Sequence, residues 1–270
     1  MLKTDTMFSG SIPETYDRHM VPLIFAPYAE DIAARVAALS PGAVLEIAAG
    51  TGVVTRALAP RLPPDASYVV TDLNPSMLDY AAARQGPDTR ITWRQADAMA
   101  LPFEDESFDV VSCQFGAMFF PDRPSAYREA RRVLKPGGHF LFSTWDRIED
   151  NDFAHDVTNA LAGMFPNDPP RFMARIPHGY HDTAAIRYDL EAAGFARVEI
   201  ETIPALSRAA SARMAAVAYC QGTPLRTEIE ARDATRLEEA TGLAEAAIAG
   251  RHGRGEIAGK IQAHVILAIA

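Results

Sequence analysis

"VLEIAAGTGVVTRAL", residues 44–58, joins strand-forming residues to the beginning of a helix through a turn of small side chains. Residues 44–47 predict a short buried strand, and the apolar spacing after the turn begins a helix. Residues 48–52 therefore form the turn itself. Gly50 and Gly52 have no Cβ, so they can adopt positive φ and expose backbone N–H groups to a ligand. This turn is the first candidate for a binding site.

Strand-like and helical segments alternate along most of the chain. Strands are predicted at residues 43–48, 67–72, 90–95, 108–113, 139–144, 196–203 and 260–270. Helices are predicted at residues 27–39, after Gly52, at 75–84 and 125–134, after a capping Asp182, and between 207 and 249. Apolar strands that alternate with helices predict a mostly parallel sheet covered on both faces. The predicted fold class is therefore doubly wound α/β.

The composition is typical of a globular protein with a small-molecule partner. The 270 residues are 48% hydrophobic and carry a net charge of −9 without a Lys/Arg block, which argues against nucleic acid as a partner. We expect no membrane span and no signal peptide. Cys113 and Cys220 have no paired spacing, so we expect reduced core thiols in a cytoplasmic protein. No metal site is predicted, because the histidines are scattered and the acidic turn at 102–109 has no His or Cys.

Two classes of ligand compete for the glycine turn. A dinucleotide needs G-x-G-x-x-G, with its pyrophosphate on the helix N-terminus. The sequence from Gly50 reads G-T-G-V-V-T, so Thr55 stands in place of the third glycine. S-adenosylmethionine carries no phosphate and needs an acid for its ribose hydroxyls and a polar partner for its adenine. The missing glycine therefore favours S-adenosylmethionine over a nicotinamide dinucleotide.

Residue types that suit S-adenosylmethionine stand where the next three predicted strands end. Asp72 ends the second strand, and its carboxylate can accept hydrogen bonds from two ribose hydroxyls. Asp97 follows the third strand and can accept from the adenine amine, while the Ala98 N–H donates to a ring nitrogen. The apolar faces for the ring are Leu73, Met77 and Met99, and the residues that flank the methionine end are Gln114 and Phe115.

Four segments in order resemble the class I S-adenosylmethionine-dependent methyltransferases, the group that includes ubiquinone/menaquinone C-methyltransferases. They are VLEIAAGTG, VVTDLNPSMLDYA, QADAMALPFEDESFDVVSCQ and EARRVLKPGGHFLFST, all within residues 41–145. The family pattern acid-x-Gly-x-Gly-x-Gly reads Glu46-x-Ala48-x-Gly50-x-Gly52 here, with alanine for the first glycine. The resemblance implies a Rossmann-like sheet of seven strands, the last antiparallel between the fifth and sixth. It also implies S-adenosylmethionine as cofactor, S-adenosylhomocysteine as product, and a cofactor site that includes the turn residues Ala49 and Thr51.

Other residues near this site have more than one interpretation. Glu46 lies in an apolar strand, where an unpaired carboxylate is costly. We expect it to bind either backbone N–H groups of the turn or the ammonium of the cofactor. Tyr16 and Tyr28 either fold over the cofactor, as similar tyrosines do in relatives, or pack in the core. Asn74 followed by Pro75 predicts the N-cap and the first residue of a helix.

The segments outside the cofactor core are predicted to form the substrate side. We expect an N-terminal helical segment at 1–40, a cofactor-binding core at 41–203 with 259–270, and a substrate-side cap formed by insertions at 146–181 and 204–258. The second insertion, packed with the N-terminal helix, forms either a lid or an oligomer surface. Candidate pocket residues for an aromatic, apolar or amine substrate are Phe119, Phe120, Trp145, Phe153, Met164, Phe165, Phe172 and Tyr180. Candidate bases are His155, His178 and His181.

Three functions remain open on the sequence. The first is methyl transfer to an O, N or C atom of a small molecule by in-line displacement, for which alignment can suffice, so no catalytic residue is assigned. An NAD(P)-dependent oxidoreductase would share the fold and Asp72, but it does not explain Asp97. A non-catalytic S-adenosylmethionine-binding protein would keep every cofactor motif.

Overall fold

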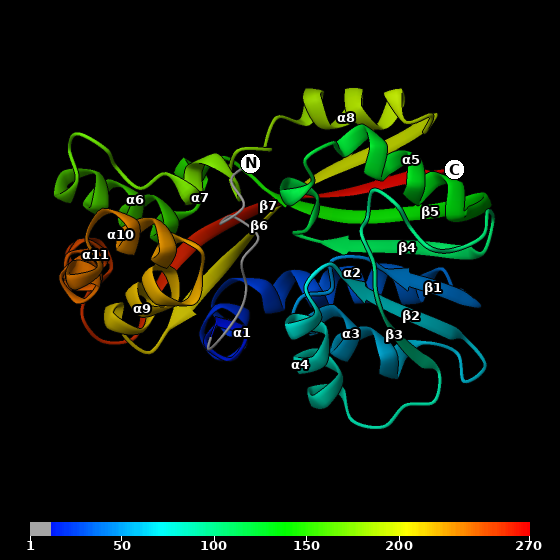
Figure 1. Ribbon diagram of the computed structural model, residues 1–270, viewed down its shortest axis with the longest axis horizontal. Helices are drawn as coiled ribbons and strands as arrows, with labels where there is room; N and C mark the ends of the chain where they lie inside the picture. The colour runs from blue at the N-terminus through cyan, green and yellow to red at the C-terminus, as the bar shows by residue number, and fades with distance from the viewer. Residues whose placement is uncertain (1–11) are drawn as a thin grey trace. The chain divides into compact units, whose positions relative to one another are not determined.

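The computed structural model describes residues 12–270 and contains a seven-stranded sheet with the strand order β3-β2-β1-β4-β5-β7-β6 (Figure 1). The strands are β1 (Ala43–Glu46), β2 (Ser67–Asp72), β3 (Ile91–Gln95), β4 (Phe108–Gln114), β5 (Leu134–Trp145), β6 (Arg197–Ala209) and β7 (Ile257–Ile269). β1 pairs in parallel with β2 and β4, β2 with β3, and β4 with β5. The predicted doubly wound α/β class is confirmed.

The last strand, β7, runs antiparallel to β5. The Ala270 N–H donates to the Gly138 carbonyl at 2.9 Å, and the Asp146 N–H, just beyond β5, donates to the Gln262 carbonyl at 3.1 Å. Residue numbers on β7 therefore fall as those on β5 rise, which defines an antiparallel pair. β7 also lies between β5 and β6, as the family resemblance implies.

The chain divides into two compact units. The sheet unit comprises residues 27–144, 180–203 and 263–270, and the helical unit comprises 145–179 and 204–262 with the described residues up to 26. Helices of the sheet unit are α2 (Ala26–Ala38), α3 (Val53–Leu58), α4 (Pro75–Gln85), α5 (Arg123–Val133) and α8 (Thr183–Ala192), with the 3-10 turns η3 (Ala59–Arg61) and η4 (Ala117–Phe119). Those of the helical unit are α1 (Ile12–Thr15), the π-helix η2 (Tyr16–Phe25), η5 (Ile148–Asp150), α6 (Asp152–Met164), α7 (Phe172–Arg175), α9 (Ala212–Gly222), α10 (Leu225–Asp233), η6 (Ala234–Arg236) and α11 (Leu237–His252).

Helices cover both faces of the sheet unit (Figure 1). On one face, Ile32 and Val36 of α2 are buried in the same apolar cluster as Val44 of β1 and Val70 of β2. On the other face α5 packs against β5, where the Tyr127 ring lies 5.3 Å from the Phe142 ring. Apolar burial on both faces explains why the central strands are nearly continuous in apolar residues. The sheet edge at the strand carboxyl ends is thereby left for ligands.

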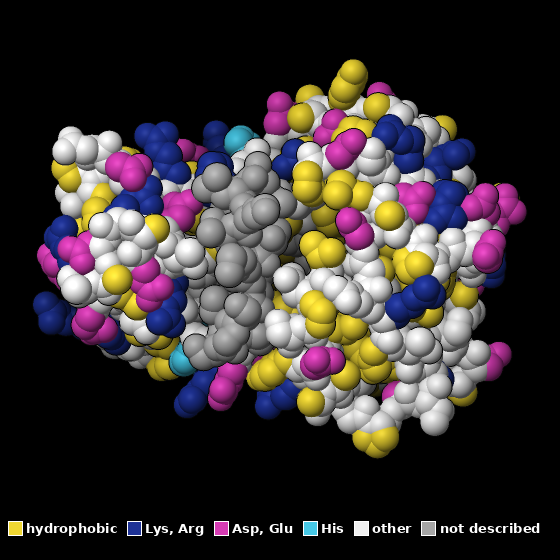
Figure 2. All heavy atoms as spheres, viewed as in Figure 1, with side chains coloured by type: hydrophobic (Ala, Val, Ile, Leu, Met, Phe, Trp, Pro, Cys, Tyr) yellow, Lys and Arg dark blue, Asp and Glu magenta, His cyan; other side chains and the backbone are white. Residues whose placement is uncertain are grey.

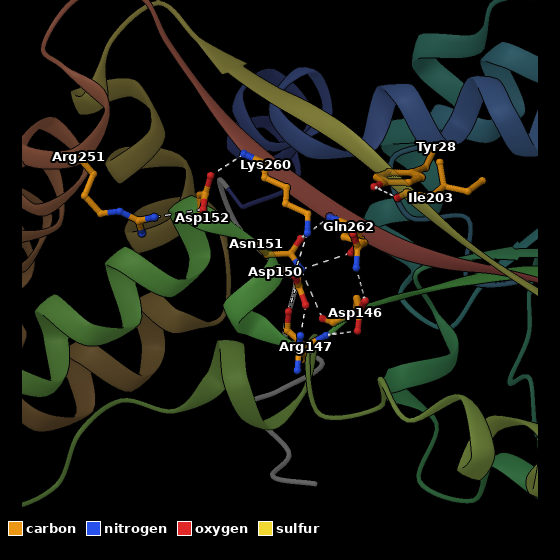
Figure 3. A network of polar contacts seen from close by, with 10 residues as sticks. All are labelled: Tyr28, Asp146, Arg147, Asp150, Asn151, Asp152, Ile203, Arg251, Lys260 and Gln262. Atoms are coloured by element: carbon orange, nitrogen blue, oxygen red, sulfur yellow. Dashed lines mark hydrogen bonds and ion pairs between the residues drawn. The ribbon is translucent and has the colours of Figure 1, made fainter.

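In the helical unit, side chains of η5 and of the start of α6 bind the first half of β7 (Figure 3). The Lys260 ammonium contacts the Asp150 carboxylate at 2.8 Å, and the Lys260 N–H donates to Asp152 at 2.6 Å. The Gln262 amide donates to the Asp146 carboxylate at 2.6 Å. Paired carboxylates thus hold this part of β7 in place. Among the described helices, none is long and apolar enough to cross a membrane.

β5 and β6 extend well beyond their predicted ranges. β5 begins at Leu134 rather than at His139, because Leu134 already pairs with Phe108 of β4. β6 continues to Ala209, where helical sequence was predicted. In that extension Ser207 and Ala209 are buried while Arg208 is exposed, so the segment has the two-residue period of a strand. Its helix-favouring alanine, leucine and arginine concealed that period, since tertiary context overrides propensity.

Candidate cofactor site

The turn after β1 adopts the conformation that its glycines allow. Gly50 has φ +57° and Gly52 has φ +78°, both in the left-handed region, so the predicted positive φ values are confirmed. A Cβ on Gly52 would lie 2.9 Å from the Ala81 Cβ of α4, so this glycine serves helix packing. Among the residues that the structure describes, a Cβ on Gly50 would meet only the Met77 Cε, at 3.9 Å. Gly50 therefore borders open space, and a ligand can approach its backbone.

Asp72 ties the turn to the end of β2. Its Oδ2 accepts from the Gly50 N–H at 2.8 Å, and its Oδ1 accepts from the Asn74 N–H at 2.8 Å. Burial raises the pKa of Asp72, and these two backbone N–H groups oppose the rise. Each oxygen keeps a further lone pair that a hydroxyl can use. Asn74 stands at the N-cap of α4 as predicted, but its side chain makes no capping hydrogen bond, because Asp72 holds its backbone and contacts its amide at 3.5 Å.

The segment after β3 brings a second carboxylate to the same edge of the sheet. The Asp97 Oδ1 accepts from the Met99 N–H at 2.9 Å, which fixes the carboxylate in a local turn. Ala98 and Met99 are half-buried in this turn. Leu73, after β2, leaves 50% of its surface exposed, a large fraction for an aliphatic side chain. A flat heteroaromatic ring that carries an amine needs an apolar surface to stack on and an acceptor for the amine. Leu73 offers the surface and the partly exposed Asp97 carboxylate offers the acceptor.

Glu46 is buried beneath the turn with partners that the sequence reasoning did not identify. Its Oε2 accepts from the Thr55 hydroxyl at 2.7 Å and from the Tyr68 hydroxyl. Among the described residues these hydroxyls, and not backbone N–H groups of the turn, are its hydrogen-bond donors, while the alternative that Glu46 approaches the cofactor ammonium stays a prediction. Burial raises the pKa of Glu46 to about 7, and the two hydroxyls only partly oppose this rise. The register could have suggested Tyr68, because Glu46 pairs with Val70 and Tyr68 faces the same side.

The segment after β4 lies at the same carboxyl-end edge of the sheet, on the opposite side of β1 from Asp72. Phe115 has φ +52°, and its N–H donates to the Ser143 carbonyl at 3.1 Å. The Tyr28 ring stands edge-on to the Phe115 ring at 5.5 Å, and the Tyr28 hydroxyl donates to the Ile203 carbonyl at 2.9 Å (Figure 3). Tyr28 thus packs beside this segment and is fully buried there. Gln114 is half-buried at the end of β4.

Apart from Tyr16, which belongs to η2 in the helical unit, the predicted cofactor residues lie in the sheet unit, at or beside the carboxyl ends of β1 to β4. Sequence reasoning also missed Arg56, whose guanidinium donates to the Thr51 carbonyl of the turn. Among the predicted pocket residues, Trp145, Phe153 and Phe172 are buried in the helical unit. His178, a candidate base, is also buried there, with its Nδ1 2.8 Å from the Asp146 carbonyl oxygen. The thiols Cys113 and Cys220 are free and buried.

Comparisons with known proteins agree with this geometry. The family described as "Methyltransferase domain" matches residues 45–142, from β1 into β5. The ubiquinone/menaquinone biosynthesis C-methyltransferase UbiE of Idiomarina loihiensis is 29% identical over 173 residues, which cover 59% of this chain and 68% of that protein. The enzyme of the same name from Hahella chejuensis is 43% identical over 101 residues, 36% of this chain and 41% of that protein.

A solved structure extends the likeness to the whole fold. Phosphoethanolamine N-methyltransferase 2 of Haemonchus contortus, in complex with S-adenosyl-L-methionine, has a TM-score of 0.63 at 17% identity and covers 100% of this chain and 60% of that chain. At this identity the likeness shows the fold alone. Together with the matched segments it defines a Rossmann-like methyltransferase. The methyltransferase segment at residues 45–142 and the fold around it identify the chain as a class I S-adenosylmethionine-dependent methyltransferase.

Proposed function

We propose that the sheet unit binds S-adenosylmethionine along the edge formed by the ends of β1 to β4. In this proposal Asp72 accepts from the ribose hydroxyls, Asp97 accepts from the adenine amine, and the Ala98 N–H donates to the ring. The observation that carries it is the open space beside Gly50, next to a carboxylate that already orders the same turn. The remaining contacts are assigned to Glu46, Ala48, Ala49, Thr51, Gly52, Leu73, Met77, Met99, Gln114, Phe115 and Tyr28.

The residues present fit this cofactor in chemistry as well as in space. Gly50 offers bare backbone, and the half-exposed Leu73 offers an apolar surface for the adenine. The Thr51 hydroxyl is buried and makes no hydrogen bond to any residue that the structure describes. When bound, S-adenosylmethionine supplies a methyl group activated by its sulfonium. The protein's own contribution is then to hold donor and acceptor in line, which is worth about 7–11 kcal/mol in well-aligned reactions.

We further propose that the acceptor is an O, N or C atom of an apolar, aromatic or amine small molecule. The negative charge of the chain favours a neutral or cationic substrate over an anionic polymer. On the face that Figure 2 shows, basic and acidic side chains of the described residues are interspersed rather than gathered in a basic stripe. This mixture supports a small-molecule partner, because binding to nucleic acid relies on clustered Lys and Arg.

The test is a calorimetric titration of the wild-type protein with S-adenosylmethionine, S-adenosylhomocysteine and NADH. Asp72→Ala and Asp97→Ala should each weaken binding of both adenosyl ligands by about tenfold or more, which corresponds to about 1.4 kcal/mol. Asp109→Ala is the matched control, since Asp109 lies at the opposite end of β4 and binds the Gly42 and Ala43 N–H groups. Binding of NADH in place of the adenosyl ligands would overturn the proposal.

A further inference from the structure

Gly116, directly after Phe115, is a glycine for reasons of space and not of backbone conformation. Its φ of −96° and ψ of −35° are accessible to any L-residue. A Cβ built on it would lie 2.5 Å from the Ala48 Cβ and 2.7 Å from the Cys113 Sγ. Both distances are far below van der Waals contact. The missing side chain of Gly116 therefore makes room for the methyl group of Ala48.

Ala48 shows the opposite mismatch. Its φ of +54° lies in the left-handed region, which glycine adopts freely and alanine adopts only at a cost. The family pattern has glycine at this position, so an unstrained alternative exists. The methyl group strains the turn after β1, and it occupies the gap that Gly116 leaves open. The residue types are therefore the reverse of what the backbone angles favour. Ala48 carries a methyl group where glycine would be unstrained, and Gly116 lacks one where the backbone would accept it.

The two residues join the two segments on which the cofactor proposal depends. Ala48 belongs to the turn that carries Gly50, and Gly116 follows Phe115 in the segment after β4. Phe115 is itself left-handed and bound through its N–H to the Ser143 carbonyl, so this segment is anchored on its β5 side. Toward the turn after β1, the nearest side-chain atom to the open position on Gly116 is the Ala48 methyl carbon.

We propose that the Ala48 methyl group is a spacer that fixes the separation of the two cofactor-binding segments, and that Ala48 and Gly116 are positioning residues for S-adenosylmethionine. This inference rests on the proposed function, because the separation matters only if one ligand contacts both segments. Without the methyl group the turn is free of strain, but its distance from the segment after β4 is no longer fixed. Stability and cofactor affinity should therefore change in opposite directions.

The first experiment compares Ala48→Gly with Ser40→Gly. Ser40 also has a positive φ, +49°, but it is exposed at the end of α2 and away from the site, so its substitution relieves strain without altering the spacer. Both variants should resist urea at least as well as the wild-type protein. Ala48→Gly should bind S-adenosylhomocysteine about tenfold more weakly, whereas Ser40→Gly should bind it within about twofold of wild type. An Ala48→Gly variant that binds as tightly as wild type would refute the spacer.

The second experiment adds a methyl group at position 116 and removes the one at position 48, singly and together. Gly116→Ala alone should lose about tenfold or more in affinity, or fail to fold, and adding Ala48→Gly should restore folding and recover most of the affinity. The cycle is made in a Cys113→Ala background, because the Sγ would crowd the new Cβ in every variant. If Gly116→Ala causes the same loss with and without Ala48→Gly, the two positions are independent and the spacer is refuted. If the wild-type protein binds neither adenosyl ligand, the proposed function itself is refuted. If the wild-type protein binds normally and Ala48→Gly binds equally well, only the spacer is refuted.

Discussion

Replacing Glu46 with glutamine should make the protein less sensitive to pH. Burial raises the pKa of this carboxyl to about 7 from an ordinary value near 4.5, so the folded protein holds a proton that the unfolded chain releases. Stability from this group is fully present below the unfolded pKa and is lost as the pH rises through the folded pKa. The shift is about 2.5 units, which at about 1.36 kcal/mol per unit gives a loss of about 3 kcal/mol.

Glutamine stays neutral at every pH and can still accept from the Thr55 and Tyr68 hydroxyls through its amide oxygen. The free energy of unfolding of Glu46→Gln should therefore lack this decline. Relative to wild type, the variant should gain about 2–3 kcal/mol between about pH 5 and pH 8. The gain should be accompanied by a matching difference in proton uptake on folding, since the slope of stability with pH counts bound protons.

The assay is urea unfolding of both proteins at a series of pH values, with the slope of each transition checked for constancy. Glu191→Gln is the matched control, because Glu191 is exposed on α8 and its loss removes the same formal charge. Its stability should run parallel to wild type across the range. Parallel curves for Glu46→Gln and wild type would show that Glu46 is ionised in the folded protein. The reasoning from burial would then be refuted.

Three further variants test single contacts. Tyr28→Phe keeps the ring beside Phe115 but loses the hydrogen bond to Ile203, so it should cost about 1 kcal/mol in urea unfolding; an unchanged midpoint would contradict the contact. Asp182→Ala removes the side chain that accepts from the Ala184 N–H at the start of α8, and should cost about 1 kcal/mol, whereas Asp182→Ser should retain most of it. Leu73→Ala should weaken binding of S-adenosylhomocysteine by about threefold or more with little change in stability, because Leu73 is half exposed without ligand; a loss of stability with unchanged affinity would place Leu73 in the core instead.

The sequence predicted the sheet well because its signals there are local. Continuous apolar strands, the Gly50 and Gly52 turn and the Asp182 cap each depend on a few neighbouring residues, and each is present in the structure. The extension of β6 to Ala209 was missed for the converse reason. Its strand conformation depends on which side chains the rest of the protein buries, and a segment with alanine, leucine and arginine gives no local sign of that.

The partners of the site residues were harder to predict than the residues themselves. A buried carboxylate at Glu46 needs hydrogen-bond donors, and this need can be predicted from its place in an apolar strand. The sequence does not say whether backbone N–H groups, a ligand or hydroxyls will meet this need, because Thr55 and Tyr68 reach Glu46 from a helix and a strand that only the fold brings together. Ala48 and Gly116 show the same limit more sharply: they lie far apart in the chain, and each looks like an ordinary small residue after a strand. Only the 2.5 Å that would separate a Cβ on Gly116 from the Ala48 Cβ reveals that the size of one residue depends on the size of the other. Residue types at strand ends can therefore identify the cofactor of such a fold, whereas the fit between its loops follows from the register of the sheet that aligns them.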